Sequence, residues 1–232
     1  MNPDRRDHGA AYFKTSLEIL GVSVPDIRRI AKSAARELRE RSADHVLGVA
    51  EALVDGGTLE GRQAAYELVA LREDALALLG KRRLDRLGRG NDNWGSVDAL
   101  ASTLAGPAWR AGRLTDKAVE QWARSPDPWW RRTALASTVP LNLPSRGGTG
   151  DPERTLKICE LLSQDSHPAV EKALSWALRS LIQHDQNGVV AFLERHEADL
   201  SPRVIREVRS KLETGRKHGA ARPRHPPPEV PE

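Results

Sequence analysis

Six tryptophans dominate the aromatic residues of this chain, which has only two phenylalanines and two tyrosines. Several lie beside charged residues: Trp94 precedes Asp98 by four positions, and Trp176 lies between Lys172 and Arg179. An indole face attracts cations, and a neighbouring carboxylate can stabilise positive charge or orient a water molecule. This combination indicates a site that holds a flat, positively charged ligand.

Two of these patterns fit single faces of helices. On a helix that begins just before Trp94, this residue and Asp98 lie one turn apart on the same face. Lys172, Trp176 and Arg179 follow one helical stripe, which suits a nucleic acid because cations meet phosphates and the indole meets a sugar or base. Ordinary packing explains both patterns too: a buried Trp beside a capping Asp, and a Trp covered by the stems of Lys and Arg.

A third pattern, Trp129-Trp130-Arg131-Arg132, stands at an expected helix start. Adjacent side chains on a helix point about 100° apart, so Arg131 and Arg132 cannot serve one spot. One of them can contact a phosphate or pair with Asp98, and the other is solvated or salt-bridged. Cations are disfavoured at the positive end of a helix, and an anionic partner would relieve that conflict. Ordinary surface charge explains the pattern equally well.

The elements that must position these residues all resemble helices. Residues 25–38 place apolar side chains on one stripe opposite Arg and Lys, with Pro25 at a favoured first-turn position. Breaks are expected at glycines and prolines such as Gly106-Pro107. Further amphipathic stretches cover 43–54, 59–71, 73–87, 93–104, 115–124, 128–139, 152–164, 168–183, 187–195 and 201–213. Short helices joined by short turns, without strand-like alternation, predict an all-α, HEAT-like α-solenoid of antiparallel helix pairs with a concave binding face.

Two segments depart from this pattern. Residues 140–150 contain two prolines and three glycines, which predicts a flexible loop between helix pairs. Residues 215–232 lack apolar periodicity, are basic in their first half and end in a proline-rich run. We therefore expect one domain over residues 1–214, followed by a disordered basic and proline-rich tail over 215–232.

Composition sets the broad class of protein. The 232 residues are 29% charged and 39% hydrophobic, as in a globular protein, and the net charge of +4 permits nucleic-acid binding without establishing it. A single cysteine, Cys159, lies in an apolar helical pattern and the histidines follow no ligand spacing, so no metal site is expected. The chain has no apolar run that could span a bilayer and no signal-peptide core, so we expect a cytoplasmic protein without a membrane partner. We also expect a monomer.

In this order, the three patterns resemble the AlkD-like DNA alkylation repair family of DNA glycosylases. The family pattern contains a Trp-x-x-x-Asp helix, a Trp-x-x-Arg-x-Ala helix and a Lys-Ala-x-x-Trp-x-Leu-Arg helix. The matching segments begin at Trp94, Trp129 and Lys172. Tyr12-Phe13-Lys14 and Arg62-Gln63-Ala64-Ala65 also look like family segments, and the resemblance extends over about residues 10–213.

The resemblance implies a solenoid whose concave face holds double-stranded DNA. It also implies that the protein excises N3- and N7-alkylated purines without a metal or organic cofactor. It implies that Asp98 is the catalytic carboxylate and that Trp94 and Trp176 contact the sugar and backbone of the damaged nucleotide. Arg132 would contact phosphate or shape the site. The residues then expected to line the site or bind DNA are Tyr12, Lys172, Arg179 and Arg131.

The implied chemistry agrees with the residues present. An N3- or N7-alkylated purine already carries positive charge, so it leaves without being protonated and the enzyme needs no general acid. The enzyme must stabilise an oxocarbenium-like sugar and help a water molecule to add, which one carboxylate and two indole faces can do. The family is also known for not flipping the lesion into a pocket, so bulky adducts would be tolerated.

Some positions depart from the family pattern. Asn93 stands where an aromatic residue is frequent, the segment before Tyr12 is short enough to predict a reduced N-terminal helix, and 140–150 looks like an insertion. Two other functions stay open. One is a non-catalytic HEAT-like module that binds DNA or serves as a scaffold, and the other is a glycosylase specialised for bulky alkyl adducts.

Overall fold

The computed structural model describes residues 2–217, and the regular secondary structure of this part is almost entirely helical. Its only β-type pairing is an isolated bridge between Glu18 and Thr58. The elements are α1 (Pro3–Phe13), α2 (Val24–Glu37), α3 (Ala43–Asp55), α4 (Leu59–Ala70), α5 (Glu73–Ala77), α6 (Lys81–Gly88), α7 (Trp94–Leu100), the π-helix η1 (Ala101–Ala105), α8 (Gly106–Arg110), α9 (Asp116–Ala123), α10 (Pro128–Asn142), the 3₁₀ helix η2 (Pro144–Arg146), α11 (Pro152–Leu161), α12 (Pro168–Leu181), α13 (Gln186–Arg195) and α14 (Pro202–Thr214).

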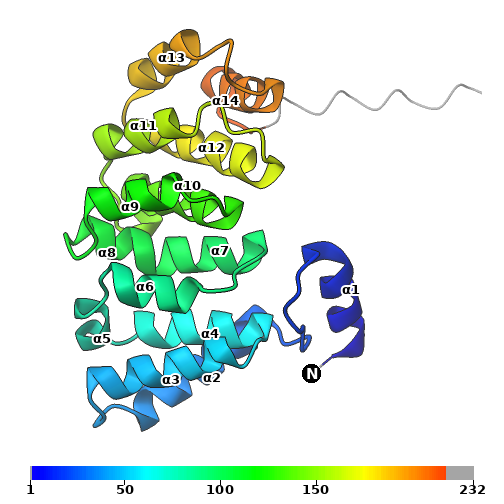
Figure 1. The fold of residues 1–232 in the computed structure, drawn as a ribbon, viewed down its shortest axis with the longest axis vertical. Helices are drawn as coiled ribbons and strands as arrows, with labels where there is room; N and C mark the ends of the chain where they lie inside the picture. Colours follow the sequence, from blue (N-terminus) through cyan, green and yellow to red (C-terminus); the bar gives the residue numbers. More distant parts are fainter. Residues whose placement is uncertain (1, 218–232) are drawn as a thin grey trace, which may run out of the picture.

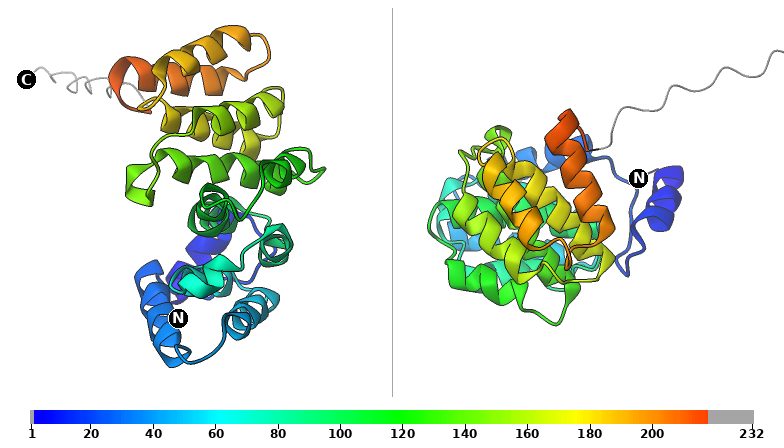
Figure 2. Two further views of the ribbon diagram at one scale, coloured as in Figure 1. Left: turned by 90° about the vertical axis from the view of Figure 1, so that its left-hand side faces the viewer. Right: turned by 90° about the horizontal axis from the view of Figure 1, so that it is seen from above.

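From α2 onward the helices stack in two layers along the long axis of the molecule (Figures 1 and 2). One row consists of α2, α4, α7, α10, α12 and α14, each of which packs on the next. The other row includes α3, α9 and α11, which pack against α4, α10 and α12 respectively. The expected all-α solenoid is therefore confirmed, and α1 stands beside the stack rather than in it (Figure 1).

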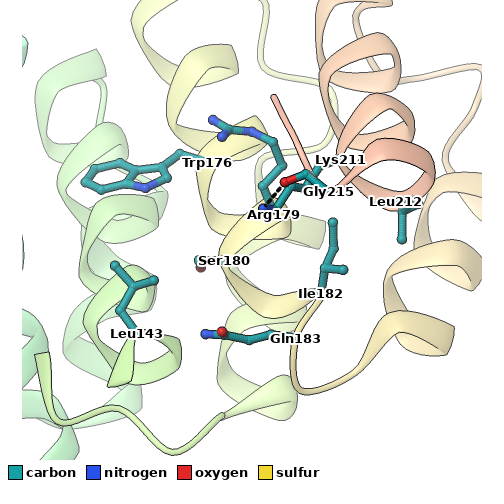
Figure 3. Close-up of a pocket in the computed structure, with 9 residues that line it drawn as sticks. All are labelled: Leu143, Trp176, Arg179, Ser180, Ile182, Gln183, Lys211, Leu212 and Gly215. Carbon is teal, nitrogen blue, oxygen red and sulfur yellow. Dashed lines mark hydrogen bonds between the residues drawn. The ribbon is translucent and has the colours of Figure 1, made fainter. Parts of the chain in front are cut away.

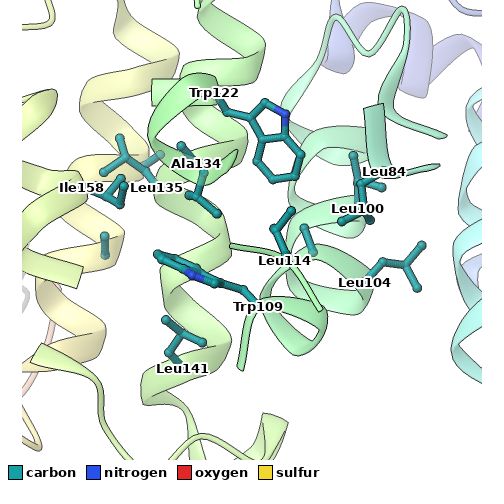
Figure 4. Packing of buried hydrophobic residues seen from close by; sticks show 14 of the residues in the cluster. Leu84, Leu100, Leu104, Trp109, Leu114, Trp122, Ala134, Leu135, Leu141 and Ile158 are labelled. Atoms are coloured by element: carbon teal, nitrogen blue, oxygen red, sulfur yellow. The ribbon is translucent and has the colours of Figure 1, made fainter. Parts of the chain in front are cut away.

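An apolar core runs through the stack between the two layers. Trp109 and Trp122 are buried there, and Figure 4 shows them among leucines of neighbouring helices. Each indole N–H is satisfied, because Trp109 donates to Asp116 at 2.7 Å and Trp122 to Asp85 at 2.7 Å. Trp109 and Trp122 are therefore packing residues of the core.

The predicted break at Gly106-Pro107 is wrong, because α7, η1 and α8 follow one another without interruption. The Gly106 N–H donates to the Ala101 carbonyl, five residues back, so the helix widens there by one residue. Pro107 follows this widened turn directly, as the second residue of α8, so it lies inside one continuous helical run. A Cβ at Gly106 would lie 2.2 Å from Cγ of Pro140, so glycine lets α8 and α10 approach closely.

The predicted loop over 140–150 also begins too early, because α10 continues through Pro140 to Asn142. Asn142 is fully buried, and its amide donates to the Thr138 carbonyl at 3.1 Å and to the Thr155 hydroxyl at 2.9 Å. After η2, the Gly150 N–H donates back to the Leu141 carbonyl at 3.0 Å. The segment is thus tied to the core by hydrogen bonds.

The remaining predictions concern the helix at 73–87, Cys159, membrane-spanning segments and the tail. The single helix expected over 73–87 is divided into α5 and α6 by a turn that buries Leu79. Cys159 is buried, as expected for a packing residue, and burial raises the pKa of its thiol. Within residues 2–217 no helix is both long and apolar enough to cross a membrane. The expected tail lies mostly outside the described residues, in 218–232.

Candidate functional site

A groove of about 800 Å³ opens between α1, α7, α10, α12 and α14. Seven of the eight site residues expected from the sequence line it, namely Tyr12, Trp94, Asp98, Arg132, Lys172, Trp176 and Arg179. Trp129, His167, Arg203 and Lys217 line it as well, although the sequence had not indicated them. Asp98 is the single carboxylate among the described lining residues, so the groove is predominantly positive.

Asp98 and Arg132 form a two-pronged ion pair in the groove. Arg132 Nε donates to Asp98 Oδ1 at 2.8 Å, and Nη2 donates to Oδ2 at 2.7 Å. The third nitrogen, Nη1, donates to the Ala169 carbonyl at 2.5 Å, so Arg132 links α7, α10 and α12. The sequence left open whether an arginine of this pattern contacts a phosphate or pairs with Asp98, and the structure shows Arg132 paired with Asp98.

The Asp98 carboxylate is positioned and still accessible. Its side chain is 19% exposed, against 7% for Arg132. Burial raises the pKa of Asp98 above its usual range, and the charge and hydrogen bonds of Arg132 oppose this rise. Because the paired oxygens are fixed by the guanidinium, the carboxylate can present negative charge to the groove without reorienting.

The start of α7 explains why Trp94 and Asp98 face the groove. Asn93 caps the helix by accepting the Ser96 N–H at 3.0 Å, which gives the position a structural role in place of an aromatic one. Trp94 remains 39% exposed and packs edge-on against Tyr12, with ring centroids 5.5 Å apart. Phe13 supports the indole from α1, at a centroid distance of 5.0 Å. Tyr12 and Trp94 thus form one aromatic wall.

Two carboxylates tie the segment after α1 to the helical stack. Asp92 accepts the Ser16 N–H at 2.6 Å and the hydroxyls of Ser16 and Thr15. Glu60 is buried and accepts the backbone N–H groups of residues 20–22, at 2.8 to 3.2 Å. The N-terminal helix that the sequence predicted to be reduced is α1, which has 11 residues and is capped by Asn2. These contacts explain how a helix outside the stack can supply a wall of the groove.

The two adjacent tryptophans of α10 have different surroundings. Trp130 stacks on Trp122 at 5.3 Å and packs against the core. Trp129 instead lines the groove, edge-on to His167, with ring centroids 6.2 Å apart. The spacing contained a signal for this, because Trp129 precedes Arg132 by one helical turn and so shares its face.

Arg131 is not brought into the groove. Its guanidinium donates to Asp165 at 2.5 Å and to the carbonyls of Ser125 and Pro126 at 3.0 and 2.9 Å. These acceptors occupy the donors that would have contacted a phosphate. Arg131 therefore ties the turn before α10 to the turn before α12, and the expectation that it contacts DNA finds no support in its position.

The stripe on α12 forms the opposite side of the groove. Lys172 is exposed there, and Trp176 and Arg179 are half-buried. Arg179 Nε donates to the Ser175 hydroxyl at 3.1 Å, and burial lowers the pKa of its guanidinium. Trp176 and Arg179 also line a second pocket of about 490 Å³ between α12 and the end of α14 (Figure 3). The second pocket therefore adjoins the groove at Trp176 and Arg179.

Comparisons with known proteins identify the family and the fold of the chain. A family model described as DNA alkylation repair enzyme matches residues 1–212. One similar solved structure is described as a predicted DNA alkylation repair enzyme from Enterococcus faecalis. It has a TM-score of 0.70 at 18% sequence identity, with 90% of this chain and 95% of that chain covered, so it shows a shared fold. No match was found among curated proteins.

Proposed function

Since the chain belongs to the family of DNA alkylation repair enzymes, we propose that it is a DNA glycosylase acting on N3- and N7-alkylated purines in double-stranded DNA. The observation that carries this proposal is the groove itself. It brings Trp94, Asp98, Arg132 and Trp176 together among exposed cations. The exposed cations suit the anionic backbone of DNA. The carboxylate and the indole faces suit the positive charge of the damaged base.

The charges of the groove fit a DNA duplex. Lys172 and Arg203 are exposed at its edge, where their ammonium and guanidinium groups can meet phosphates. Tyr12 and Trp94 bound the groove from α1 and α7, and Trp176 bounds it from α12. We expect the sugar of the damaged nucleotide to lie between these aromatic faces, above Asp98. In an open groove of this kind the base can leave without being flipped into a pocket.

The reaction requires charge stabilisation rather than a proton donor. As the N-glycosidic bond breaks, its electron pair passes to the alkylated purine, which leaves as a neutral base, and the sugar becomes an oxocarbenium-like cation. The Asp98 carboxylate, held by Arg132, would stabilise that cation and orient a water molecule. Water then adds to the sugar carbon and releases its proton to the solvent.

Release of free base from methylated duplex DNA tests the proposal. The protein should liberate 3-methyladenine or 7-methylguanine above the spontaneous rate, measured by chromatography of the free bases. A protein that binds the duplex and releases neither base would refute glycosylase activity and favour the non-catalytic module. Comparison of single-turnover rates on small and bulky adducts separates the general enzyme from one specialised for bulky lesions.

A further inference from the structure

His167 lines the groove and caps α12, and its ring is held in place from two sides. Its Nδ1 accepts the Ala169 N–H at 3.2 Å, and the ring lies edge-on to Trp129. The Ala169 carbonyl accepts in turn from Nη1 of Arg132, at 2.5 Å. The imidazole is therefore linked through a single residue to the guanidinium that pairs with Asp98.

The cap determines which ring nitrogen carries the proton. A nitrogen that accepts a hydrogen bond is unprotonated, so the neutral imidazole of His167 carries its proton on Nε2. Among the described residues, the hydrogen bonds of His167 use its Nδ1 and its backbone N–H but not Nε2. In this tautomer Nε2 donates and cannot accept, which excludes His167 as the base that takes a proton from the attacking water.

Helix capping alone does not account for a histidine at this position. Serine, threonine, asparagine and aspartate are the preferred caps, and each of them has an oxygen that can accept the Ala169 N–H. The imidazole adds a longer side chain with a second polar atom, an N–H that the fold leaves to the groove. His167 therefore offers the groove a hydrogen-bond donor in a fixed position.

The charges around this donor favour an anionic ligand. Lys172 is exposed at the groove, and Arg203 lines it as well. Asp98, the one carboxylate among the described lining residues, already accepts two hydrogen bonds from Arg132. We propose that His167 Nε2–H donates a hydrogen bond to a backbone phosphate that flanks the damaged nucleotide. The proposal rests on the proposed function in taking DNA as the ligand of the groove.

This contact relates the DNA backbone to the carboxylate. Ala169 and Arg132 join His167 to Asp98, so a phosphate held by the imidazole has a defined place relative to Asp98. The sugar attached to that phosphate is thereby placed above the carboxylate. His167 binds the backbone and takes no part in breaking the N-glycosidic bond.

Two variants separate the phosphate contact from the helix cap. His167→Ser keeps a preferred cap but is too short to reach the ligand, whereas His167→Ala removes both functions. The ligand is a duplex with one tetrahydrofuran abasic residue, which a glycosylase cannot cleave. Both variants should bind it about 10- to 100-fold more weakly, and only His167→Ala should lower the denaturant midpoint. The control His45→Ser removes an exposed histidine outside the groove and should bind like the wild type.

A neutral methylphosphonate linkage identifies the atom that is bound. Placed on one side or the other of the abasic residue, it should weaken wild-type binding about 10- to 100-fold at the linkage that His167 contacts. The same replacement should cost His167→Ser at least about fivefold less affinity than it costs the wild type, because the donor is already absent. A purely structural role of His167 would leave the two losses additive.

The outcomes separate the phosphate contact from the enzyme. Wild-type affinity in His167→Ser overturns the contact, and so does a methylphosphonate effect of equal size in both proteins at both linkages. If the wild type releases alkylated bases in either case, the glycosylase proposal stands alone. If the contact is found but the wild type releases no base, the contact stands and the glycosylase proposal fails. A wild type without affinity for duplex DNA overturns both.

Discussion

Replacing Asp98 with asparagine removes one negative charge from the groove and leaves the size of the side chain unchanged. In the wild type, the carboxylate accepts hydrogen bonds of 2.8 and 2.7 Å from Arg132. The asparagine oxygen can keep one of them. Arg132 stays charged and only 7% exposed, now without a counter-charge. The site therefore changes from a neutral pair to a net positive charge facing the sugar.

The size of the effect follows from this change of charge. A unit charge about 4 Å from the developing sugar cation, at an effective dielectric constant of about 20, contributes about 4 kcal/mol. Loss of that stabilisation slows excision by about 10³-fold. Arg132 repels the sugar cation in the wild type and in the variant alike, so the difference between them comes from the lost carboxylate charge alone. The free energy of unfolding should fall by about 3 kcal/mol, because one partner of a largely buried pair is removed.

Single-turnover release of 7-methylguanine from a duplex with one lesion measures this prediction, with rates corrected for the folded fraction. The matched control is Asp165→Asn, which breaks the Arg131 pair outside the groove, where the Asp165 side chain is 9% exposed. The control should lose stability and keep its excision rate. The electrostatic role of Asp98 is refuted if Asp98→Asn stays within about tenfold of the wild type, or if Asp165→Asn slows excision equally.

Three further predictions concern residues around the groove. Because Arg132 opposes the burial that raises the pKa of Asp98, Arg132→Gln should move the acidic limb of the pH–rate profile to higher pH; an unmoved limb contradicts the pairing role. Trp176→Ala should slow excision about 5- to 30-fold, from the loss of about 1–2 kcal/mol of stacking and cation–π stabilisation, whereas Trp176→Phe should retain part of it; equal losses exclude a role for the aromatic face. Burial raises the pKa of Glu207, but the Ser175 hydrogen bond and two nearby cations lower it more, so its stabilisation is present above the unfolded pKa of about 4.3 and lost as pH falls. The difference in free energy of unfolding between wild type and Glu207→Gln should therefore shrink from about pH 6 to about pH 3 in denaturant titrations, and a constant difference refutes this assignment.

The sequence predicted the helices well where apolar stripes were regular, as in 25–38 and 168–183, because periodicity reflects burial directly. It failed at Gly106-Pro107 and at Pro140, where glycine and proline normally interrupt helices. There, α8 and α10 pack so closely that a Cβ at Gly106 would collide with Pro140, and the tertiary contact overrides local preference. A local pattern cannot reveal a contact between residues more than 30 positions apart.

The same limit applies to the site. Spacing on one helix placed Trp94 with Asp98, and Trp176 with Lys172, because these pairs are set by helical geometry. It left open which arginine pairs with Asp98, since that depends on how α10 is rotated against α7. Arg203 and Lys217 belong to helices or turns far along the chain, and no local signal joins them to Trp94.

Two carboxylates, Asp98 and Glu207, pair with cations that line the groove, and they differ in how accessible they are. Glu207 is almost fully buried, and its two oxygens contact the Ser175 hydroxyl and Lys217 Nζ. It can therefore position Ser175 and Lys217, but it cannot contact a substrate. Asp98 is held as firmly by Arg132, yet part of its side chain remains open to the groove. Only an accessible carboxylate can approach the charge that develops on a bound sugar. We therefore expect Asp98 to carry the proposed chemistry, and changes at Glu207 to act on DNA affinity and stability rather than on bond cleavage.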